Sequence, residues 1–286
     1  MIKVLNPGFY STIQDFGRFG FQEFGVPYSG VMDRKAAAFA NALLGNNKDE
    51  AVLEMTMTGA TLQFNIQTYI AISGADVPAK LNDVDIPLNK IICVKPEDVL
   101  FVGKFNTGIR CYLAVLGGFK TEIVFNSKSM YHNITKNNIL QKNDELSVLE
   151  SFTISEAQHA TIRFNTAYIN SNSIEVFKGP EFDFLSEYQQ NILFSKSFSI
   201  SKNNNRMAYQ LEEILENNLE PIITSVVLPG TVQLTPSGKL IILMRDCQTT
   251  GGYPRVLQLK ESAINVLAQK FTKEAITFKN VVTMPN

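Results

Sequence analysis

Histidine and cysteine, which often carry catalysis or bind metals, are scarce in this sequence. The 286 residues include two histidines, His132 and His159, and three cysteines, Cys93, Cys111 and Cys247. Their spacing fits no zinc motif, and no histidine stands near Cys247 to activate it as a nucleophile. The sequence therefore disfavours a metal site and a histidine-based catalytic triad. We expect both histidines at the surface and the three cysteines as reduced, buried core residues.

A marked excess of charge of either sign is also missing. Lysine and arginine number 26 and the acidic residues 27, which gives a net charge of −1 at pH 7. Proteins that bind nucleic acid or anionic membranes usually carry a basic excess, so the sequence predicts neither partner. No apolar run approaches the roughly 18 residues of a membrane span. The strand-like Met1–Leu5 stops at Asn6–Gly8 instead of extending into a signal peptide. We expect a cytoplasmic protein.

Short strand-like stretches separated by turn residues make up most of the predicted secondary structure. An apolar fraction of 45% suits a globular chain with a sizeable core. Alternation and β-branched residues predict strands at 61–64, 69–72, 91–94, 99–102, 109–116, 174–177, 240–244 and 275–278. Helical spacing predicts helices only at 32–44, 180–194 and 261–271, and Gly45 marks the end of the first. This pattern predicts a mainly β, barrel-rich fold, with surface loops at 120–144 and 201–205.

The segment before the first predicted helix has the composition of a binding site. Ser29 and Gly30 precede a helix whose first N–H groups lack partners and could hold an anion. Arg18 could add a bidentate cation, and we expect it to form one anion-binding wall with Ser29 and Asp33. A purely structural interpretation stays open, in which Ser29 caps the helix and Asp33 complements its dipole.

A second unusual stretch, MRDCQTTGGYPR at 244–255, ends a buried-looking strand. Its two glycines allow close approach of backbone to a ligand, although they match neither a P-loop nor a dinucleotide fingerprint. Three small polar side chains after an apolar strand would be costly to bury without partners. We expect Gln248–Tyr253 to face a cavity. A tight connection between strands is the alternative.

Several strings resemble the family formed by the C subunit of 5-oxoprolinase, which is also called KipA or allophanate hydrolase subunit 2 and is related to biotin-dependent carboxyltransferases. They are STIQDFGRFGFQEFGVPYSGVMD, AVLEMTMTGATLQF, ISGAD, RCYLAVLGG and LPGTVQLTPSGKLIILMRDCQTTGGYPR, and they span nearly the whole chain. The resemblance implies one carboxyltransferase/KipA-type domain over 1–286 with cyclophilin-like β-barrel lobes. We expect two lobes, at about 1–90 and 91–286.

The resemblance also implies a reaction and partners. It predicts ATP-dependent opening of 5-oxo-L-proline to L-glutamate, with ATP and Mg²⁺, together with the enzyme's A subunit and with its B subunit, a KipI-type protein. Two alternatives stay open. One is a carboxyltransferase subunit of a urea amidolyase-type enzyme, for which we expect no biotin attached to this chain. The other is a KipA-like regulator that binds a KipI-type kinase inhibitor.

Opening an activated lactam calls for carboxylates and for donors that hold anionic oxygens. The candidate catalytic carboxylates are Asp15, Asp33, Glu54 and Asp246. The candidate substrate- or anion-binding residues are Gln14, Arg18, Ser29, Gly30, Arg110, Arg206, Gln233, Gln248, Thr249, Thr250, Gly251, Gly252 and Tyr253.

The chain departs from the family pattern mainly in its second half. Where the family has Gly-Ser-Arg-Ser-Thr, this chain has Asn-Ser-Lys-Ser-Met at 126–130. A following stretch that contains glycines in the family has none in this chain, at 136–144. An acid and an arginine are absent from 204–211, and Thr224-Ser225 replaces Ser-Glu. Lysine and glutamine do not reproduce arginine's fork of donors, so the site either tolerates these changes or binds a somewhat different ligand.

Overall fold

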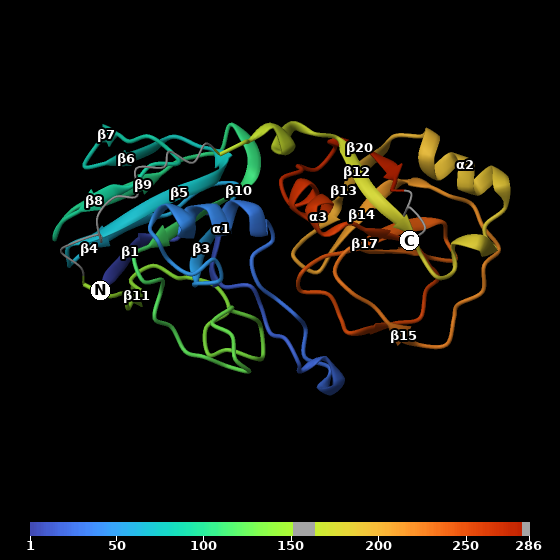
Figure 1. Ribbon diagram of the computed structural model, residues 1–286, viewed down its shortest axis with the longest axis horizontal. Coiled ribbons are helices and arrows are strands. Elements are labelled where there is room, and N and C mark those ends of the chain that lie inside the picture. The colour runs from blue at the N-terminus through green and yellow to red at the C-terminus, as the bar shows by residue number, and fades with distance from the viewer. Residues whose placement is uncertain (151–163, 282–286) are drawn as a thin grey trace. The chain divides into compact units, whose positions relative to one another are not determined.

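The computed structural model describes residues 1–150 and 164–281, and the chain divides into two compact units (Figure 1). Unit 1 comprises Met1–Arg18 and Ser29–Ile169, and unit 2 comprises Phe19–Tyr28 and Asn170–Asn286. The division therefore falls at residue 169, whereas we expected it near residue 90 from the sequence. The reason is sheet pairing, because β10 (Thr107–Val115) is hydrogen-bonded to strands that precede residue 90.

Unit 1 is built from two packed sheets. The first has the strand order β11-β1-β4-β9-β6-β7, and the second has the order β2-β3-β10-β5-β8. One apolar cluster draws on both sheets, including Val4 and Leu62 from the first and Leu53 and Leu113 from the second. The remaining strands of unit 1 are β1 (Ile2–Asn6), β2 (Tyr10–Gln14), β3 (Val52–Thr56), β4 (Thr61–Phe64), β5 (Thr68–Asp76), β6 (Ala79–Leu81), β7 (Val84–Asp85), β8 (Ile92–Val94), β9 (Val99–Val102) and β11 (Glu145–Leu146).

Helix α1 (Arg34–Leu43) covers the other face of the second sheet (Figure 1). Three of its alanines, Ala36, Ala37 and Ala40, are buried against Tyr112 and Ala114 of β10. Small side chains let the helix approach the sheet closely, so the alanine stripe found in the sequence determines where α1 packs. The helix begins two residues later than predicted because Asp33 is its N-cap, and Gly45 follows its end with φ of 70°.

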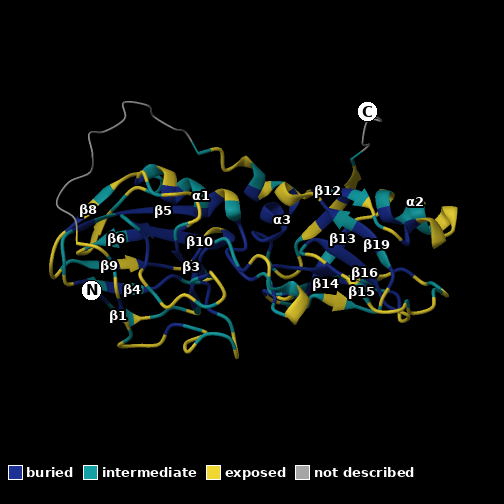
Figure 2. Ribbon diagram, turned by 60° about the horizontal axis from the view of Figure 1, so that its bottom comes forward, coloured by how far each residue is buried: buried dark blue, intermediate teal, exposed yellow. Residues whose placement is uncertain are grey.

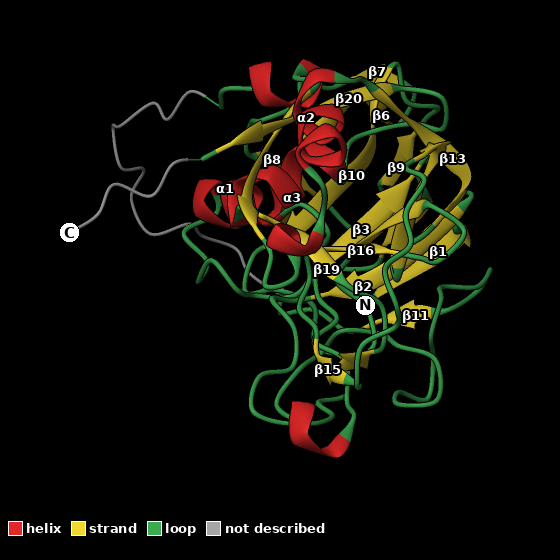
Figure 3. Cartoon of the chain, turned by 90° about the vertical axis from the view of Figure 1, so that its right-hand side faces the viewer, coloured by secondary structure: helices red, strands yellow, loops and turns green. Residues whose placement is uncertain are grey.

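Unit 2 contains a closed barrel with the strand order β12-β19-β16-β17-β14-β13-β20 and a two-stranded ribbon, β15-β18. The prediction of a mainly β chain is confirmed, and Figure 3 shows how far strands outweigh helices. The strands are β12 (Ser173–Lys178), β13 (Phe198–Asn204), β14 (Ala208–Ile214), β15 (Ser225–Val226), β16 (Thr231–Leu234), β17 (Lys239–Leu243), β18 (Thr250–Gly251), β19 (Arg255–Leu259) and β20 (Ala275–Asn280).

The two helices predicted for unit 2 are shorter than expected. The second is split into a 3-10 turn, η3 (Phe182–Phe184), and α2 (Glu187–Ser195), because Ser186 and Gln189 form a capping box that restarts the helix. The third, α3, covers Glu261–Leu267. Further 3-10 turns are η1 (Gln22–Phe24) in unit 2 and η2 (Ala167–Asn170). No helix among the described residues is long and apolar enough to cross a membrane.

Burial follows the strands of both units (Figure 2) and corrects three expectations. Cys111 and Cys247 are buried, but Cys93 is exposed because β8 is the edge strand of its sheet. The stretch 120–144 contains buried residues and is not merely a surface loop, and 201–204 belongs to β13. His132 is exposed as expected, and His159 lies outside the described residues.

Candidate functional site

A row of polar side chains crosses the sheet beneath α1. Glu54 on β3 lies opposite Thr12 on β2 and opposite Tyr112 on β10, and Tyr112 in turn lies opposite Ser73 on β5. All four side chains are buried, Glu54 to 1% exposure. Cross-strand partners point to the same face of a sheet, so the pairing places the four groups side by side.

Glu54 holds the backbone that leads into α1. Its Oε2 accepts a 2.7 Å hydrogen bond from the Met32 N–H, and its Oε1 lies 3.8 Å from Nε of Arg110. A buried carboxylate is costly unless it is paired, and the guanidinium and the N–H provide that pairing. Burial raises the pKa of the Tyr112 hydroxyl, and the neighbouring Glu54 carboxylate raises it further, so Tyr112 stays protonated.

Asp33 occupies the N-terminus of α1 with its own carboxylate. Its Oδ1 accepts from the Ala36 N–H at 3.1 Å, and its Oδ2 accepts from the Tyr168 hydroxyl at 2.6 Å. Burial, and next the Asp33 charge, raise the pKa of Tyr168, which keeps this phenol a donor. A carboxylate here already uses the positive end of the helix dipole. The geometry therefore favours the capping interpretation for Asp33 over a wall that receives an external anion.

The turn Ser29–Asp33 is fixed by hydrogen bonds from three successive backbone N–H groups. The N–H of Val31 donates to the Asp15 carbonyl at 2.8 Å, that of Met32 to Glu54, and that of Asp33 to the Tyr112 hydroxyl at 2.8 Å. Ser29 and Gly30 both have positive φ, 57° and 92°. This conformation is uncommon for a residue with a Cβ, so Ser29 is held in a strained geometry.

Gly30 has no room for a side chain. A Cβ at this position would lie 2.7 Å from the carbonyl carbon of Phe16 and 2.8 Å from the nitrogen of Gly17. The adjacent Ser29 is fully buried, and no described residue hydrogen-bonds its Oγ. Buried hydroxyls nearly always have a partner, so a strained serine without one is a candidate for contact with a ligand.

Asp15 organises a loop that lies far away in the sequence. Its carboxylate accepts hydrogen bonds from the hydroxyls of Ser127 and Ser129, at 2.7 and 2.6 Å, and from two backbone N–H groups, those of Gly17 at 2.8 Å and Lys128 at 2.6 Å. Four donors occupy most of its lone pairs. This arrangement favours a structural role for Asp15 over general-base catalysis.

Arg18 and Gln14 hold the same loop. The fully buried Arg18 donates from Nη2 to the Ser129 carbonyl, and Gln14 donates from Nε2 to the Met130 carbonyl at 3.1 Å. The structure thus brings three predicted site residues, Gln14, Asp15 and Arg18, around one segment. That segment, 126–130, is one of the places where the chain departs from the family pattern.

In unit 2, Arg206 and Asp246 form a bidentate ion pair. Nε donates to Oδ2 at 2.8 Å and Nη2 donates to Oδ1 at 3.0 Å, and Arg206 is 6% exposed. A planar fork matched to a carboxylate is a strong, well-directed pair. The two residues thus stabilise each other, which argues against Asp246 as a free catalytic base and against Arg206 as an open anion site.

The stretch 248–253 is attached to a neighbouring ribbon. Thr250 and Gly251 form β18 and pair with β15, the Thr249 carbonyl accepts from Val227 at 3.1 Å, and the Gly252 carbonyl accepts from Ile222 at 2.9 Å. Thr250 and Tyr253 are exposed, and Gln248, Thr249 and Gly252 are half-buried. Much of this loop's backbone is therefore used in a strand connection, the alternative that the sequence left open.

Gln233 links the barrel to this loop. The residue is 2% exposed, and its Nε2 donates to the Tyr253 carbonyl at 3.4 Å. A Cβ on Gly251 would lie 2.5 Å from the same nitrogen, so a side chain there would displace the Gln233 amide.

Several residues of these networks were not among the candidate site residues. Tyr112 could have been found from its place opposite Glu54 once the strands were aligned. Tyr168, Ser127 and Ser129 gave no local signal, because their partners lie more than 100 residues away. No group of three or more His, Cys, Asp or Glu side chains that could hold a metal ion occurs within 1–150 and 164–281.

Comparison with known sequences identifies relatives along the whole chain. The family "carboxyltransferase domain, subdomain A and B" matches residues 24–280. The 5-oxoprolinase C subunit of Escherichia coli K12 is 32% identical over 276 residues, which covers 94% of this chain and 87% of that protein. The Haemophilus influenzae C subunit is 30% identical, with 98% and 91% covered. The urea amidolyase of Lachancea kluyveri is 40% identical over 130 residues, or 45% of this chain and 7% of that protein.

Solved structures share the fold. The urea amidolyase of Kluyveromyces lactis superimposes with a TM-score of 0.85 and 27% identity over 98% of this chain, which spans 19% of that protein. The urea carboxylase of the same yeast gives a TM-score of 0.85 and 27% identity, and this chain spans 27% of it. The chain thus corresponds to one module of those longer proteins, and it belongs to the carboxyltransferase-domain family that includes the C subunit of 5-oxoprolinase.

Proposed function

We propose that the chain is the C subunit of an ATP-dependent 5-oxoprolinase, which opens 5-oxo-L-proline to L-glutamate together with its A and B subunits. The observation that carries the proposal is that two bacterial 5-oxoprolinase C subunits align with this chain over nearly their whole length. The alignment with the E. coli protein covers 94% of this chain and 87% of that protein, and the alignment with the H. influenzae protein covers 98% and 91%. The sequence match to the urea amidolyase of L. kluyveri, in contrast, covers 45% of this chain.

The strained turn provides the group that we assign to the substrate. Ser29 Oγ is buried without a described partner, and the Glu54–Tyr112–Asp15 contacts hold the backbone around it. A hydroxyl in a fixed position can donate to an oxygen on which charge develops when an activated lactam is attacked. We assign Glu54, Arg110 and Tyr112 to positioning, because their contacts act on the turn.

The burial of Ser29 suggests why partner proteins are needed. Its side chain is fully buried in the free chain, so a substrate can reach it only after a local opening. We assign that opening to assembly with the enzyme's B subunit, which is a KipI-type protein, and with its A subunit. On this proposal the isolated chain is inactive.

ATP would activate the lactam oxygen in the assembled complex. The described residues of this chain offer no cluster of three metal-binding side chains, and Asp15 and Asp33 already accept several hydrogen bonds each. These residues do not fit a Mg²⁺ site. We therefore assign nucleotide and Mg²⁺ binding to the assembly as a whole and derive no step through the metal.

A second function is favoured by the structural neighbours. The urea amidolyase and urea carboxylase of K. lactis match 98% of this chain with a TM-score of 0.85. A carboxyltransferase component that acts on a urea-like amide, with biotin carried on another polypeptide, is the alternative proposal.

Reconstitution separates the two functions. The chain is combined with candidate A and B subunits from the same genome and given ATP, Mg²⁺ and 5-oxo-L-proline, and glutamate is measured with glutamate dehydrogenase. We expect glutamate only when all three proteins and ATP are present. Omission of this chain is the control. Turnover of urea with a carboxylated biotin carrier, without glutamate formation from 5-oxoproline, would establish the alternative instead.

A further inference from the structure

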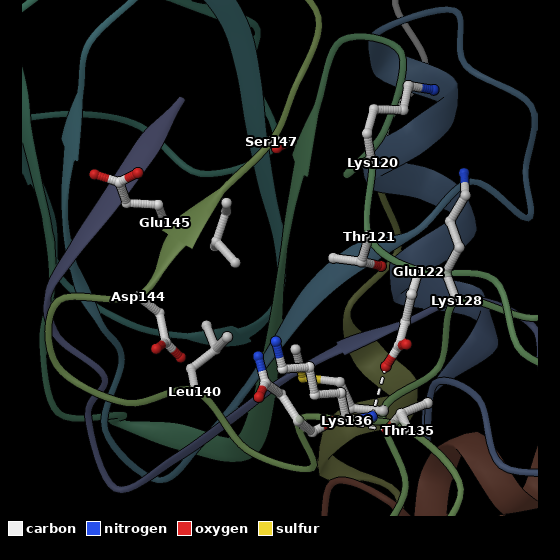
Figure 4. Close-up of a pocket in the computed structure, with 13 residues that line it drawn as sticks. Lys120, Thr121, Glu122, Lys128, Thr135, Lys136, Leu140, Asp144, Glu145 and Ser147 are labelled. Carbon is white, nitrogen blue, oxygen red and sulfur yellow. Dashed lines mark hydrogen bonds between the residues drawn. The ribbon is translucent and has the colours of Figure 1, made fainter.

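A cavity of about 250 Å³ lies in unit 1, beside the 126–130 segment that Asp15 holds. Figure 4 shows Lys120, Thr121 and Glu122 across from Leu140, Asp144 and Glu145. The lining also includes Met130, Leu140 and Leu146, which are 7%, 2% and 4% exposed and form a buried apolar floor. The remaining lining residues are Lys128, Thr135, Lys136, Asn137 and Ser147.

Most charged groups of this cavity already have partners. Lys128 Nζ pairs with Glu50 at 3.0 Å, the Glu122 carboxylate accepts from the Lys136 backbone N–H at 2.6 Å (the dashed line in Figure 4), and Asp144 accepts from the Gln141 N–H at 2.8 Å. Lys120 Nζ donates to the Gly117 carbonyl. The protein itself therefore satisfies these groups.

The lining groups that remain uncommitted among the described residues include two donors, the Thr121 hydroxyl and the Lys136 ammonium, and also the exposed side chains of Asn137 and Glu145. Thr121 Oγ1 is buried and has no hydrogen-bond partner, and no ion pair or hydrogen bond forms at the ammonium of Lys136. A buried hydroxyl left without a partner costs roughly 1–3 kcal/mol, so a group that satisfies it is favoured. A hydroxyl donor and an ammonium above an apolar floor match one carboxylate on a compact apolar body.

We propose that this cavity binds a small organic monocarboxylate. The carboxylate contacts the Lys136 ammonium and the Thr121 hydroxyl, and the body of the ligand lies on Met130, Leu140 and Leu146. Two features exclude larger ligands: the volume is small, and the acidic Glu122 and Asp144 at the rim disfavour a polyanion such as a nucleotide. The choice of 5-oxo-L-proline as a probe rests on the proposed function, whereas the site itself does not.

The cavity shares a wall with the loop that Asp15 holds. Lys128 and Met130 line the cavity, while the Lys128 N–H donates to Asp15 and the Met130 carbonyl accepts from Gln14. A bound carboxylate therefore contacts the same short segment that the candidate site uses. Binding should shift the amide signals of 127–130 as well as those of 121 and 136.

The test is binding to the full-length chain, followed by NMR and calorimetry, with three probes. 5-Oxo-L-proline carries ring, lactam and carboxylate; cyclopentanecarboxylate lacks the lactam; and 2-pyrrolidinone lacks the carboxylate. We expect the two carboxylates to bind and 2-pyrrolidinone to bind at least about tenfold more weakly, since charge-assisted contacts dominate. Lys136→Gln and Thr121→Val should each weaken the carboxylates about five- to tenfold.

Lys142→Gln is the matched control, because Lys142 is an exposed lysine of the same loop that does not line the cavity. It should leave all three affinities unchanged. Equal effects of Lys136→Gln and Lys142→Gln, equal binding of 2-pyrrolidinone, or no carboxylate binding at tens of millimolar would each overturn the proposal. Glutamate formation by the reconstituted complex is scored separately. Its absence together with variant-sensitive binding would count against the proposed function and leave this site standing.

Discussion

Replacement of Ser29 by glycine separates a functional serine from a structural one. Ser29 has φ of 57°, is fully buried, and has no described hydrogen-bond partner for its Oγ. The left-handed backbone conformation costs a residue with a Cβ about 1–2 kcal/mol, and glycine avoids this cost. Glycine is also more flexible in the unfolded chain, which reduces the gain from the substitution by about 0.5–1 kcal/mol. Removal of the unpartnered hydroxyl adds about 1 kcal/mol. The free energy of unfolding should therefore rise by about 1–2 kcal/mol, and Tm by a few degrees.

Activity should change in the opposite direction. If Ser29 donates to the substrate in the transition state, Ser29→Gly and Ser29→Ala should both lower kcat/KM of the reconstituted complex by at least about tenfold, or roughly 1.4 kcal/mol. The two variants should differ in stability, since alanine keeps the backbone strain that glycine relieves. Urea unfolding monitored by circular dichroism measures the stability, and the glutamate assay measures the rate.

Lys273→Gly is the matched control for the backbone effect. Lys273 has φ of 73° and is exposed in unit 2, so its replacement should raise stability slightly and leave kcat/KM unchanged. A Ser29→Gly protein that is less stable than the wild type yet fully active would refute the reasoning, because the hydroxyl would then be a structural group.

Three further outcomes follow from the same geometry. Gly30→Ala should destabilise unit 1 by several kcal/mol in urea unfolding, because its Cβ would lie 2.7 Å from backbone; a change below about 1 kcal/mol would contradict the packing. Tyr168→Phe removes the 2.6 Å hydrogen bond to Asp33 and should cost about 1–3 kcal/mol, whereas an unchanged Tm would show that this contact is not formed. Hydrogen bonds from Arg255 lower the pKa of Glu181 below its usual value near 4.5, so the stabilisation by this carboxylate is present above that pH and is lost as the pH falls below it. Glu181→Gln should therefore flatten the fall in stability on acidification below about pH 4.5, and an equal fall in both proteins would refute this reasoning.

Local signals in the sequence predicted much of the fold, because each depends on neighbouring residues. The alanine stripe located α1, and Gly45 located its end. Alternating apolar residues located strands in both units, and the predictions 61–64 and 99–102 match β4 and β9 without change.

Long-range contacts could not be predicted in the same way. Asp15 meets Ser127 and Ser129 across separations of 112 and 114 residues, and Arg206 meets Asp246 across 40. No local pattern records which loops meet, because that depends on how the sheets assemble. The unit boundary was missed for a related reason: no change in composition marks it, and Phe19–Tyr28 belongs to unit 2 although the residues on either side belong to unit 1.

These contacts change how the candidate carboxylates are best understood. Asp15, Asp33 and Asp246 each accept several hydrogen bonds or a bidentate arginine, so their negative charge already stabilises the fold. A carboxylate with its lone pairs occupied is a poor proton acceptor, whatever its position in a motif. A motif that is rich in acids can therefore serve to hold one small group in place. In unit 1 the Glu54 carboxylate and the Tyr112 hydroxyl hold the backbone of the turn that contains the strained Ser29, and this positioning role needs no contact with a substrate.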